Sequence, residues 1–480
     1  MKEQLEALID YIKRKNIGYA DVRYVDRRSE SITVKNGRLE ALARNENRGV
    51  GVRILHNGCW GFASGSIITP AALKKLADKA ISIAKASAVT QKQSAVLAAV
   101  EVFVSKYSSP CLEDPFAVAL DEKIGLLTNV CEILDKNKKV KISDTGLDFF
   151  RTDKIFASTE GALIEQTIIE SGGGYTATAV EKGDAQKRSY PASHRGDYRC
   201  AGYEFIRELD FLSHAERVAD EAVALLSAPP CPAGKSDIII SGDQMALQVH
   251  ESCGHPTELD RVLGTEISYA GGSFMTIDKL GKLQYGSPVV NIVQDATIPY
   301  ALGSFGYDDE GVKACRTDVI REGLFVGYLT SRETAPLVKA APNGTMRADG
   351  WNNIPLIRMT NINLEPGSWD YDALVEDTKD GILMVSNKSW SIDDKRLNFQ
   401  FGVEAAWQIK DGKLGTMYKN PLYTGITPEF WNSCDAICNQ NHWRIWGIPS
   451  CGKGQPPQTA HVAHGTSPAR FRKVTVGVSK

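Results

Sequence analysis

The sequence predicts an α+β protein: an N-terminal unit of helices and antiparallel sheet, followed by a large β-rich C-terminal domain that carries a metal-binding helix. Three observations lead to this prediction. Helical, strand-like and again helical patterns follow one another within the first 90 residues. The sequence after residue 233 is rich in Gly and in short strand-like runs. One short helical pattern near residue 250 carries two histidines and a glutamate.

The N-terminal segment begins with a helical pattern over residues 4–15, whose apolar residues recur on one face. Strand-like segments then fill residues 21–55, and Asn-Gly dipeptides occur at residues 36–37 and 57–58. Asn-Gly between alternating segments is the strongest short-range signal for a β-hairpin. A second helical pattern begins at Thr69, so we expect an antiparallel sheet with helices on one face.

The middle of the chain predicts a second α+β segment, with helices at about residues 116–134 and 210–226. Strands are expected between them at residues 139–143, 147–150, 167–170 and 175–180. The glycines at 172–174 are expected to end a run of strands. A Pro cluster at 229–232 cannot continue a helix and marks the main domain boundary. The predicted domains are residues 1–90, 91–228 and 233–480.

The C-terminal domain is expected to consist mainly of strands, with one late helix. Strand-like runs occur at residues 289–293, 324–329, 382–385, 404–409 and 473–476. Asp411-Gly412 predicts another hairpin turn. The late helix begins at Thr427-Pro428, and its spacing predicts one face made of Phe430, Cys434, Ile437 and Cys438.

Composition excludes several classes of protein. The chain of 480 residues is 42% hydrophobic and 24% charged, with a net charge of −2, which gives no electrostatic case for binding nucleic acid or an anionic membrane. The first residues form no continuous apolar segment, and no later run reaches membrane-spanning length. We therefore expect a cytoplasmic protein whose ten cysteines are reduced.

The central motif is His250-Glu251 followed by His255, a His-Glu-x-x-x-His array. On a regular helix a spacing of five advances the chain by about 500°, which leaves the two imidazoles roughly 140° apart. A π-helical turn, with its i to i+5 hydrogen bonds, would bring them together. Gly254 and Pro256 favour such a distortion, because Gly relaxes the backbone and Pro lacks an N–H. Asp243 is the predicted N-cap of this helix.

The array predicts a zinc site with His250 and His255 as two of its ligands. The alternative is two unrelated histidines, but chance would produce this pattern in roughly one such chain in a hundred. Glu251 is next to His250 and cannot easily share its metal-facing side, so we assign it the role of general base. Zinc would lower the pKa of the attacking water towards roughly 7. Cys253 is expected to be a packing residue.

A catalytic zinc needs a third protein ligand, and the sequence offers several. The candidates are Glu258, Asp260, Cys434, Cys438, Cys451, His461 and His464. The Cys434/Cys438 pair shares its predicted face with Phe and Ile, which indicates packing. The two tail histidines lie in a polar segment and are expected to be solvated. Cys451 lies between Pro and Gly, where a sharp turn could aim its side chain at an ion.

The motif His250 to Asp260 resembles the signature of the TldD/PmbA family of metallopeptidases. Further segments resemble the blocks of that family in the same order, so the resemblance covers nearly the whole chain. They are Gly49–Arg53 with Gly61–Ala63, Asp308–Gly311, Arg358–Asn361 and Cys451–Lys453. The resemblance implies Cys451 as the third ligand, and a zinc peptidase that acts on unfolded or small peptides. One departure is Pro256, where many relatives carry Gly.

The resemblance also implies a dimer, either a homodimer or a heterodimer with a related family member, whose sites face an enclosed cavity. Two other functions stay open. The chain could be a non-catalytic assembly partner of a related subunit, although such sister chains lack the signature residues that are present here. It could also be a zinc amidohydrolase on small amides, because the same metal chemistry serves any amide.

Overall fold

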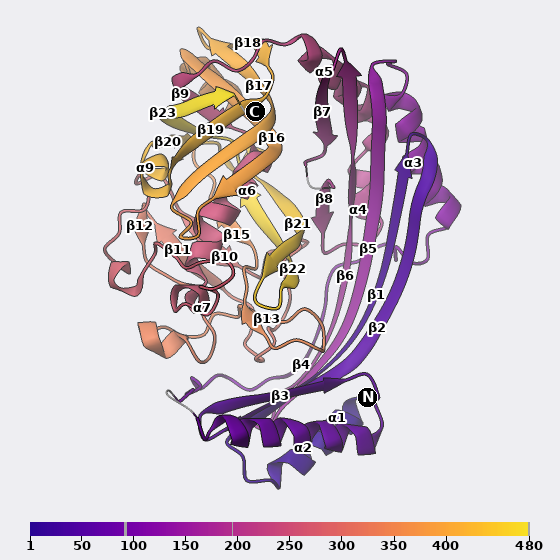
Figure 1. The fold of residues 1–480 in the computed structure, drawn as a ribbon, viewed down its shortest axis with the longest axis vertical. Coiled ribbons are helices and arrows are strands. Elements are labelled where there is room, and N and C mark those ends of the chain that lie inside the picture. Colours follow the sequence, from indigo (N-terminus) through magenta and orange to yellow (C-terminus); the bar gives the residue numbers. More distant parts are fainter. Residues whose placement is uncertain (91–93, 194, 479–480) are drawn as a thin grey trace.

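The computed structural model describes residues 1–90, 94–193 and 195–478. It has two parts: a long N-terminal sheet backed by helices, and a β-rich C-terminal body that lies against the opposite side of that sheet (Figure 1). The predicted α+β class, with a large β-rich C-terminal region, is confirmed. Within the described residues, no helix is long and apolar enough to cross a membrane.

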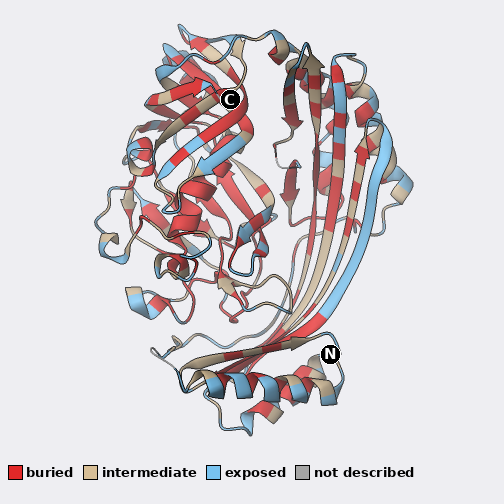
Figure 2. Ribbon diagram, viewed as in Figure 1, coloured by how far each residue is buried: buried red, intermediate tan, exposed pale blue. Residues whose placement is uncertain are grey.

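The N-terminal sheet has the strand order β3-β2-β1-β5-β6-β4, and β7 and β8 both pair with β6. Its strands are β1 (Tyr19–Lys35), β2 (Arg38–His56), β3 (Cys59–Gly65), β4 (Val104–Ser108), β5 (Val140–Ser158), β6 (Leu163–Glu181), β7 (Asp184–Tyr190) and β8 (Asp197–Arg199). Strands on both sides of residues 91–93 share this one sheet. Figure 2 shows buried residues along the central strands, whereas residues 38–48 of β2, which extend beyond its pairing with β3, are exposed.

Five helices cover this sheet. They are α1 (Lys2–Lys13), α2 (Pro70–Ser87), α3 (Leu120–Leu134), α4 (Glu204–Glu208) and α5 (Phe211–Ser227). The first two close one end of the sheet, where Leu5, Ile9 and Leu73 pack against β1 and β2 in one apolar cluster. The other three pack near the opposite end around Phe149 and Tyr175. The apolar stripes of these helices thus face the sheet, as the sequence patterns predict.

The predicted hairpin turns are confirmed. Asn36 and Gly37 have φ values of 49° and 70°, and they join β1 directly to β2. Positive φ at both central residues is the geometry of a type I′ turn, which Asn-Gly adopts readily. The dipeptides at 57–58 and 411–412 likewise have positive φ and join consecutive strands.

The prediction that the glycines at 172–174 end a strand is wrong, because β6 runs through them without interruption. The glycines serve close packing instead. A Cβ on Gly172 would lie 2.0 Å from the ring of Tyr198, and one on Gly174 would lie 2.5 Å from Cα of Gly196. The separate short strands predicted on either side are therefore one 19-residue strand.

The C-terminal body is built on a seven-stranded sheet in which six strands follow the order β16-β9-β23-β19-β17-β18 and the seventh, β20, pairs with β23. Pairing of β16 with β17 closes a ring. Its strands are β9 (Gly234–Ile240), β16 (Asp380–Ile392), β17 (Asn398–Lys410), β18 (Lys413–Tyr418), β19 (Pro421–Ile426), β20 (Cys434–Ile437) and β23 (Ala469–Val478). The smaller sheets contain β10 (Ile292–Asp295), β11 (Arg316–Arg321), β12 (Leu324–Phe325), β13 (Met346–Arg347), β14 (Leu356–Ile357), β15 (Ile362–Leu364), β21 (Arg444–Lys453) and β22 (Gln458–Thr466).

The helices of this body are short. They are α6 (Gly242–Val249), α7 (Leu259–Val262), α8 (Tyr371–Asp377) and α9 (Thr427–Asn432), and short turns of helix occur at η3 (Ile277–Lys279), η4 (Ala335–Val338) and η5 (Gln440–His442). The late helix is shorter than predicted, because Cys434 already belongs to β20 and pairs with Phe471 of β23. The shared helical face of Cys434 and Cys438 therefore does not exist.

Charged residues join the two parts. Arg53 of β2 forms an ion pair with Glu310 at 3.3 Å, and Arg23 of β1 and Lys154 of β5 both pair with Asp309, at 3.4 and 2.8 Å. Arg53 and Glu310 belong to the segments 49–53 and 308–311, which lie far apart in the sequence. The structure shows that they meet at the interface of the sheet and the body. The domain limits at residues 90 and 228 to 233 stay a prediction.

Candidate metal centre

The motif forms a π-helical turn. α6 ends at Val249, η1 (His250–Gly254) is π-helical, and η2 (His255–Thr257) is a 3₁₀ turn. The amide of His255 donates to the carbonyl of His250, which is the i to i+5 bond of a π-helix. The predicted distortion is thus confirmed, and it places the two imidazole centroids 4.8 Å apart.

Two details explain the course of this segment. A Cβ on Gly254 would lie 2.0 Å from Sδ of Met359, so the close approach of the segment between β14 and β15 requires glycine here. The predicted N-cap, Asp243, is wrong: the N-cap is Ser241, and Asp243 lies in the first turn. The Asp243 carboxylate instead accepts hydrogen bonds from the hydroxyls of Ser241 and Ser386.

His250, His255 and Cys451 lie together, and one ligand atom from each is within 4.8 Å of the others. Nε2 of His255 is 3.8 Å from Sγ of Cys451. Nitrogen and sulfur ligands of a tetrahedral zinc lie roughly 3.5 Å apart, at Zn–N of about 2.0 Å and Zn–S of about 2.3 Å. The three side chains therefore fit a zinc ion with little adjustment, although their roles as ligands stay a prediction.

Hydrogen bonds fix the orientation of both imidazoles. Nδ1 of His250 lies 2.8 Å from Nε2 of His464, whose own Nδ1 is 2.8 Å from the carbonyl of Ile362. A carbonyl only accepts, so His464 donates from Nδ1 and accepts from His250 at Nε2. Nδ1 of His255 lies 2.9 Å from Glu258. Both histidines thus keep Nε2 as a lone-pair donor, and such outer partners are typical of metal sites.

The protonation states also suit a metal. Burial lowers the pKa of His250, and it lowers those of His255 and His464 still further, so that all three rings are neutral at pH 7. Burial alone would raise the pKa of the Cys451 thiol, but the positive charge of Arg358 opposes burial, and the pKa lies below its usual value. Zinc binds neutral imidazole and thiolate, and a thiol with a lowered pKa loses its proton readily.

Cys451 lies in β21, and the sharp turn predicted around it is wrong. The strand instead has an irregular register between Ile448 and Cys451, after which Cys451 pairs with Ala460 of β22. Arg358 donates to the backbone carbonyl of Cys451. The irregularity and this bond fix the direction of the Cys451 side chain.

Lys453 ties the Cys451 strand to the motif. Its Nζ is 2.7 Å from Asp260 and 3.4 Å from Glu258, and its side chain is fully buried. Glu258 and Asp260 were candidates for the third ligand, but the first accepts from His255 and the second pairs with Lys453. They support the centre rather than complete it.

The tail histidines are not solvated, contrary to the prediction. Both belong to β22 and are buried, at 7% exposed for His461 and 0% for His464. Their segment is polar in sequence, but it packs between the N-terminal sheet, which contacts His461, and the motif, which contacts His464. Residues three apart on a strand point to opposite faces, so His464 faces His250 whereas His461 faces the N-terminal sheet.

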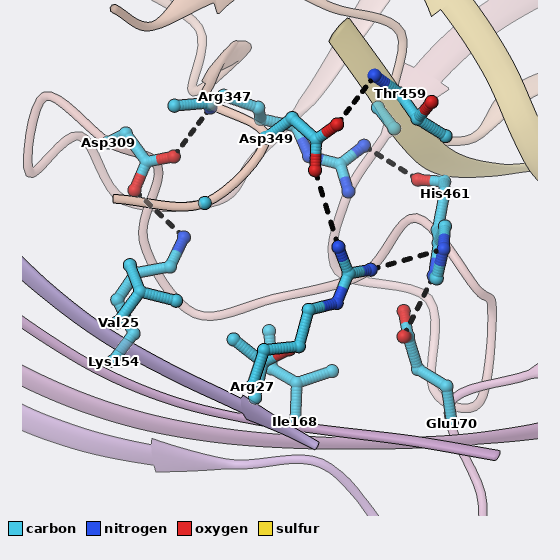
Figure 3. A pocket seen from close by; sticks show the side chains of 14 residues that line it. Val25, Arg27, Lys154, Ile168, Glu170, Asp309, Arg347, Asp349, Thr459 and His461 are labelled. Carbon is cyan, nitrogen blue, oxygen red and sulfur yellow. Dashed lines mark hydrogen bonds and ion pairs between the residues drawn. The ribbon is translucent and has the colours of Figure 1, made fainter. Parts of the chain in front are cut away.

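A polar cavity of about 90 Å³ lies on the His461 side of β22, between this strand and the N-terminal sheet (Figure 3). Nδ1 of His461 is 2.8 Å from Glu170, and its Nε2 is 3.2 Å from Arg27. Arg27 also pairs with Asp349 at 3.3 Å. His461, one of the candidate third ligands, lines this cavity, whereas His250, Glu251, His255 and Cys451 do not.

Glu251 points to a partner that sequence reasoning missed. Its Oε2 is 2.6 Å from Nη1 of Arg396, in the turn between β16 and β17. Cys253, two residues on, is fully buried in the apolar core, as expected of a packing residue. Cys434 and Cys438 are also buried in apolar clusters, and all ten cysteines are free thiols.

Three partners of the centre were missed: His464, Arg396 and Arg358. Arg358 is the first residue of the segment 358–361, which resembles a block of the family, so the sequence did mark this residue. His464 had been considered only as a ligand. Nothing in the local sequence marks Arg396, because its neighbours form an ordinary hairpin turn and its partner Glu251 is 145 residues away.

Comparison with known proteins identifies the class. Residues 20–84, 113–226 and 233–478 match, in order, domain 1, the central domain and the C-terminal domain of the PmbA/TldA metallopeptidases. The chain therefore belongs to the PmbA/TldD family of metallopeptidases.

Individual relatives support this membership. A metalloprotease of Methanocaldococcus jannaschii is 32% identical over 419 residues, which cover 87% of this chain and 89% of that protein. A zinc metalloprotease TldD homolog of Saccharolobus solfataricus is 22% identical over 478 residues, which cover 98% of this chain and 99% of that protein. The crystal structure of TldE from Thermococcus kodakarensis has the same fold, with a TM-score of 0.73 at 15% identity over 99% of this chain and 100% of that one.

Proposed function

We propose that the protein is a zinc-dependent peptidase that hydrolyses unfolded or small peptides, with His250, His255 and Cys451 as the protein ligands. The observation that carries this proposal is the group of three ligand atoms within 4.8 Å of one another. The outer partners of both imidazoles add support, because they leave each Nε2 free. The names of the Methanocaldococcus and Saccharolobus relatives point to the same chemistry.

Zinc, when bound, would acidify the attacking water and polarise the substrate carbonyl. Glu251 is proposed as the general base that takes a proton from this water and passes it to the leaving amine. Burial keeps His250 and His255 neutral, and the hydrogen bonds to His464 and Glu258 hold each ring in the tautomer that leaves Nε2 without a proton. The positive charge of Arg358 lowers the pKa of Cys451 and so favours loss of its proton.

The burial of the centre supports the choice of substrate. His250, Glu251, His255 and Cys451 are between 3% and 6% exposed. A peptide bond inside a stably folded protein cannot approach such a site, whereas an extended chain or a small peptide can enter a narrow opening. Small amides would enter equally well, so the experiment must also distinguish a peptidase from an amidohydrolase.

The deciding experiment combines metal analysis with substrate profiling. The purified protein should hold about one zinc per chain, and it should cleave peptides in an unstructured mixture, with products identified by mass spectrometry. Wild-type zinc content in both the His250→Ala and His255→Ala variants would defeat the metal assignment. Cleavage of small amides without any peptide products would establish the amidohydrolase instead. A protein that binds zinc but cleaves neither would be the non-catalytic assembly partner.

We further propose that the protein acts as a dimer, through its β-rich domain, with the sites enclosed. The partner is a second copy or a related chain, since the relative named TldE shares the fold. Light scattering on the purified chain, alone and mixed with its candidate partner, measures the assembly. Rapid cleavage of a stably folded substrate by a solution monomer would contradict the enclosed arrangement.

A further inference from the structure

We propose that Arg396 is a second catalytic group, whose positive charge first stabilises the Glu251 carboxylate and then the oxygen of the scissile carbonyl. This inference rests on the proposed peptidase function and deepens it. It starts from one contact: the Arg396 guanidinium, from the β16–β17 turn, lies against the residue proposed as general base.

The contact is short and sheltered. Nη1 of Arg396 is 2.6 Å from Oε2 of Glu251, and the two side chains are 16% and 8% exposed. The guanidinium carries five N–H donors. Its Nε is buried and has no hydrogen-bond partner among the described residues. Arg396 therefore holds Glu251 with one donor and keeps a second donor, Nε–H, without a partner.

The turn fixes the position of Arg396. Its amide donates to the carbonyl of Asp393 at 2.9 Å, and its carbonyl accepts from the hydroxyl of Thr427 at 3.1 Å. Asp393 also accepts from the amide of Leu397 at 2.8 Å. Arg396 itself adopts a left-handed conformation with φ of 63°, which only surrounding contacts hold in a non-glycine residue. The guanidinium is thus placed by the fold and does not reach the site from a loose loop.

The charge balance of amide hydrolysis explains what this cation does. Water forms a C–O bond to the carbonyl carbon, the C=O π pair moves to the carbonyl oxygen, and a water proton moves to Glu251. One negative charge therefore leaves the Glu251 carboxylate and one appears on the former carbonyl oxygen. The proton on Glu251 then passes to the leaving nitrogen as the C–N bond breaks and the oxygen re-forms its double bond. Negative charge returns to Glu251 in this same step, which leaves a neutral carboxylic acid and a neutral amine.

A fixed cation that reaches both oxygens stabilises both states of this cycle. In a buried site such a preorganised charge is worth far more than in water, because little solvent competes for it. A cation that only gripped Glu251 would weaken the base and slow the reaction. Nε of Arg396 has no hydrogen-bond partner among the described residues, so it could donate to the substrate oxygen. This supports a cation that stabilises both oxygens over one that only holds Glu251.

The test uses Arg396→Ala, Arg396→Lys and the matched control Lys395→Ala. Lys395 is the preceding residue of the same turn, carries the same charge and is exposed. In the zinc-loaded protein we expect Arg396→Ala to lower kcat by about 100- to 1,000-fold while KM changes little. Arg396→Lys should retain part of the rate, and free guanidinium should restore part of it in the Ala variant. Lys395→Ala should keep wild-type kinetics.

Binding supplies a readout independent of turnover. A phosphinate peptide mimics the tetrahedral anion, and calorimetry should show weaker binding to Arg396→Ala by a factor similar to the loss of kcat. Zinc content should stay at the wild-type level in all three variants. If wild type cleaves no substrate, the proposed function fails, and the phosphinate comparison alone decides the role of Arg396.

Three results would overturn the role of Arg396. Unchanged kcat and unchanged phosphinate affinity in Arg396→Ala would show that the cation does not act on the reaction. A higher kcat would show that Arg396 restrains Glu251. Loss of rate without rescue by guanidinium and with full phosphinate affinity would show that Arg396 only positions Glu251.

Discussion

His250 and His464 form a hydrogen bond of 2.8 Å that joins the motif to a strand 214 residues later. The carbonyl of Ile362 determines its direction, because it can only accept from Nδ1 of His464. The chain of bonds leaves Nε2 of His250 unprotonated and free to bind an ion. One backbone carbonyl thus selects the tautomer of a proposed metal ligand.

Replacing His464 with Ala should lower zinc affinity by about 10- to 100-fold, the usual effect of losing an outer partner of a metal-bound histidine. The ring of His250 then loses the acceptor that fixes its tautomer. The measurement is competition for zinc with a chelator of known affinity. His461→Ala is the matched control, since it lies on the other face of the same strand and should leave zinc affinity unchanged. Equal affinities in wild type and His464→Ala would assign His464 to packing.

Replacing Glu251 with Gln should keep zinc and fold but lower hydrolysis on the order of a thousandfold. The amide keeps the shape of the side chain but cannot accept a proton from water. Steady-state kinetics and zinc analysis of the same sample measure both effects. Wild-type turnover in this variant would move the base elsewhere, and Glu258 or Asp260 would be examined next.

The sequence could predict the features that depend on near neighbours. A spacing of five between His250 and His255, with Gly254 and Pro256 beside it, predicted the π-helical turn that is observed. Asn36-Gly37 predicted a hairpin, because its backbone preference is local. In each case the physical cause lies within a few residues of the effect.

Features that depend on distant contacts were missed. The glycines at 172–174 look like a strand end in sequence, but Tyr198 and Gly196 pack against them and the strand continues. Cys434 and Cys438 have helical spacing, but pairing with β23 makes Cys434 part of a strand. Arg396 reaches Glu251 only through the folded ring of strands. Each of these features depends on contacts with residues far away in the sequence, which a local sequence pattern cannot reveal.

Replacing Asp309 with Asn should cost stability at neutral pH and cost less in acid. Burial alone would raise the pKa of Asp309, but Lys154 and Arg23 outweigh it and lower that pKa from 3.8 to about 2. A depressed carboxyl pKa contributes stability above the unfolded value, and that stability is lost as pH falls through the folded value. The shift corresponds to roughly 2 kcal/mol at pH 7.

Urea denaturation at several pH values tests this prediction. The difference in free energy of unfolding between wild type and Asp309→Asn should be constant above about pH 5 and should shrink below about pH 4. Asp220→Asn, at an exposed position on α5, controls for the loss of one charge. A difference that does not change with pH would mean that Asp309 acts through hydrogen-bond geometry and not through its charge.

Cys451 should bind the metal through its thiolate, and cobalt substitution can detect this bond directly. A thiolate ligand gives Co²⁺ a charge-transfer absorption in the near ultraviolet, so the cobalt-loaded protein should show this band. Cys451→Ser should abolish the band and weaken zinc binding, because an oxygen ligand replaces soft sulfur. Cys434→Ser and Cys253→Ser remove equally buried thiols from apolar surroundings and should keep the band. If Cys451→Ser keeps both the band and the zinc affinity of wild type, another residue supplies the third ligand. Glu258, whose carboxylate lies 2.9 Å from Nδ1 of His255, is then the next candidate for that ligand.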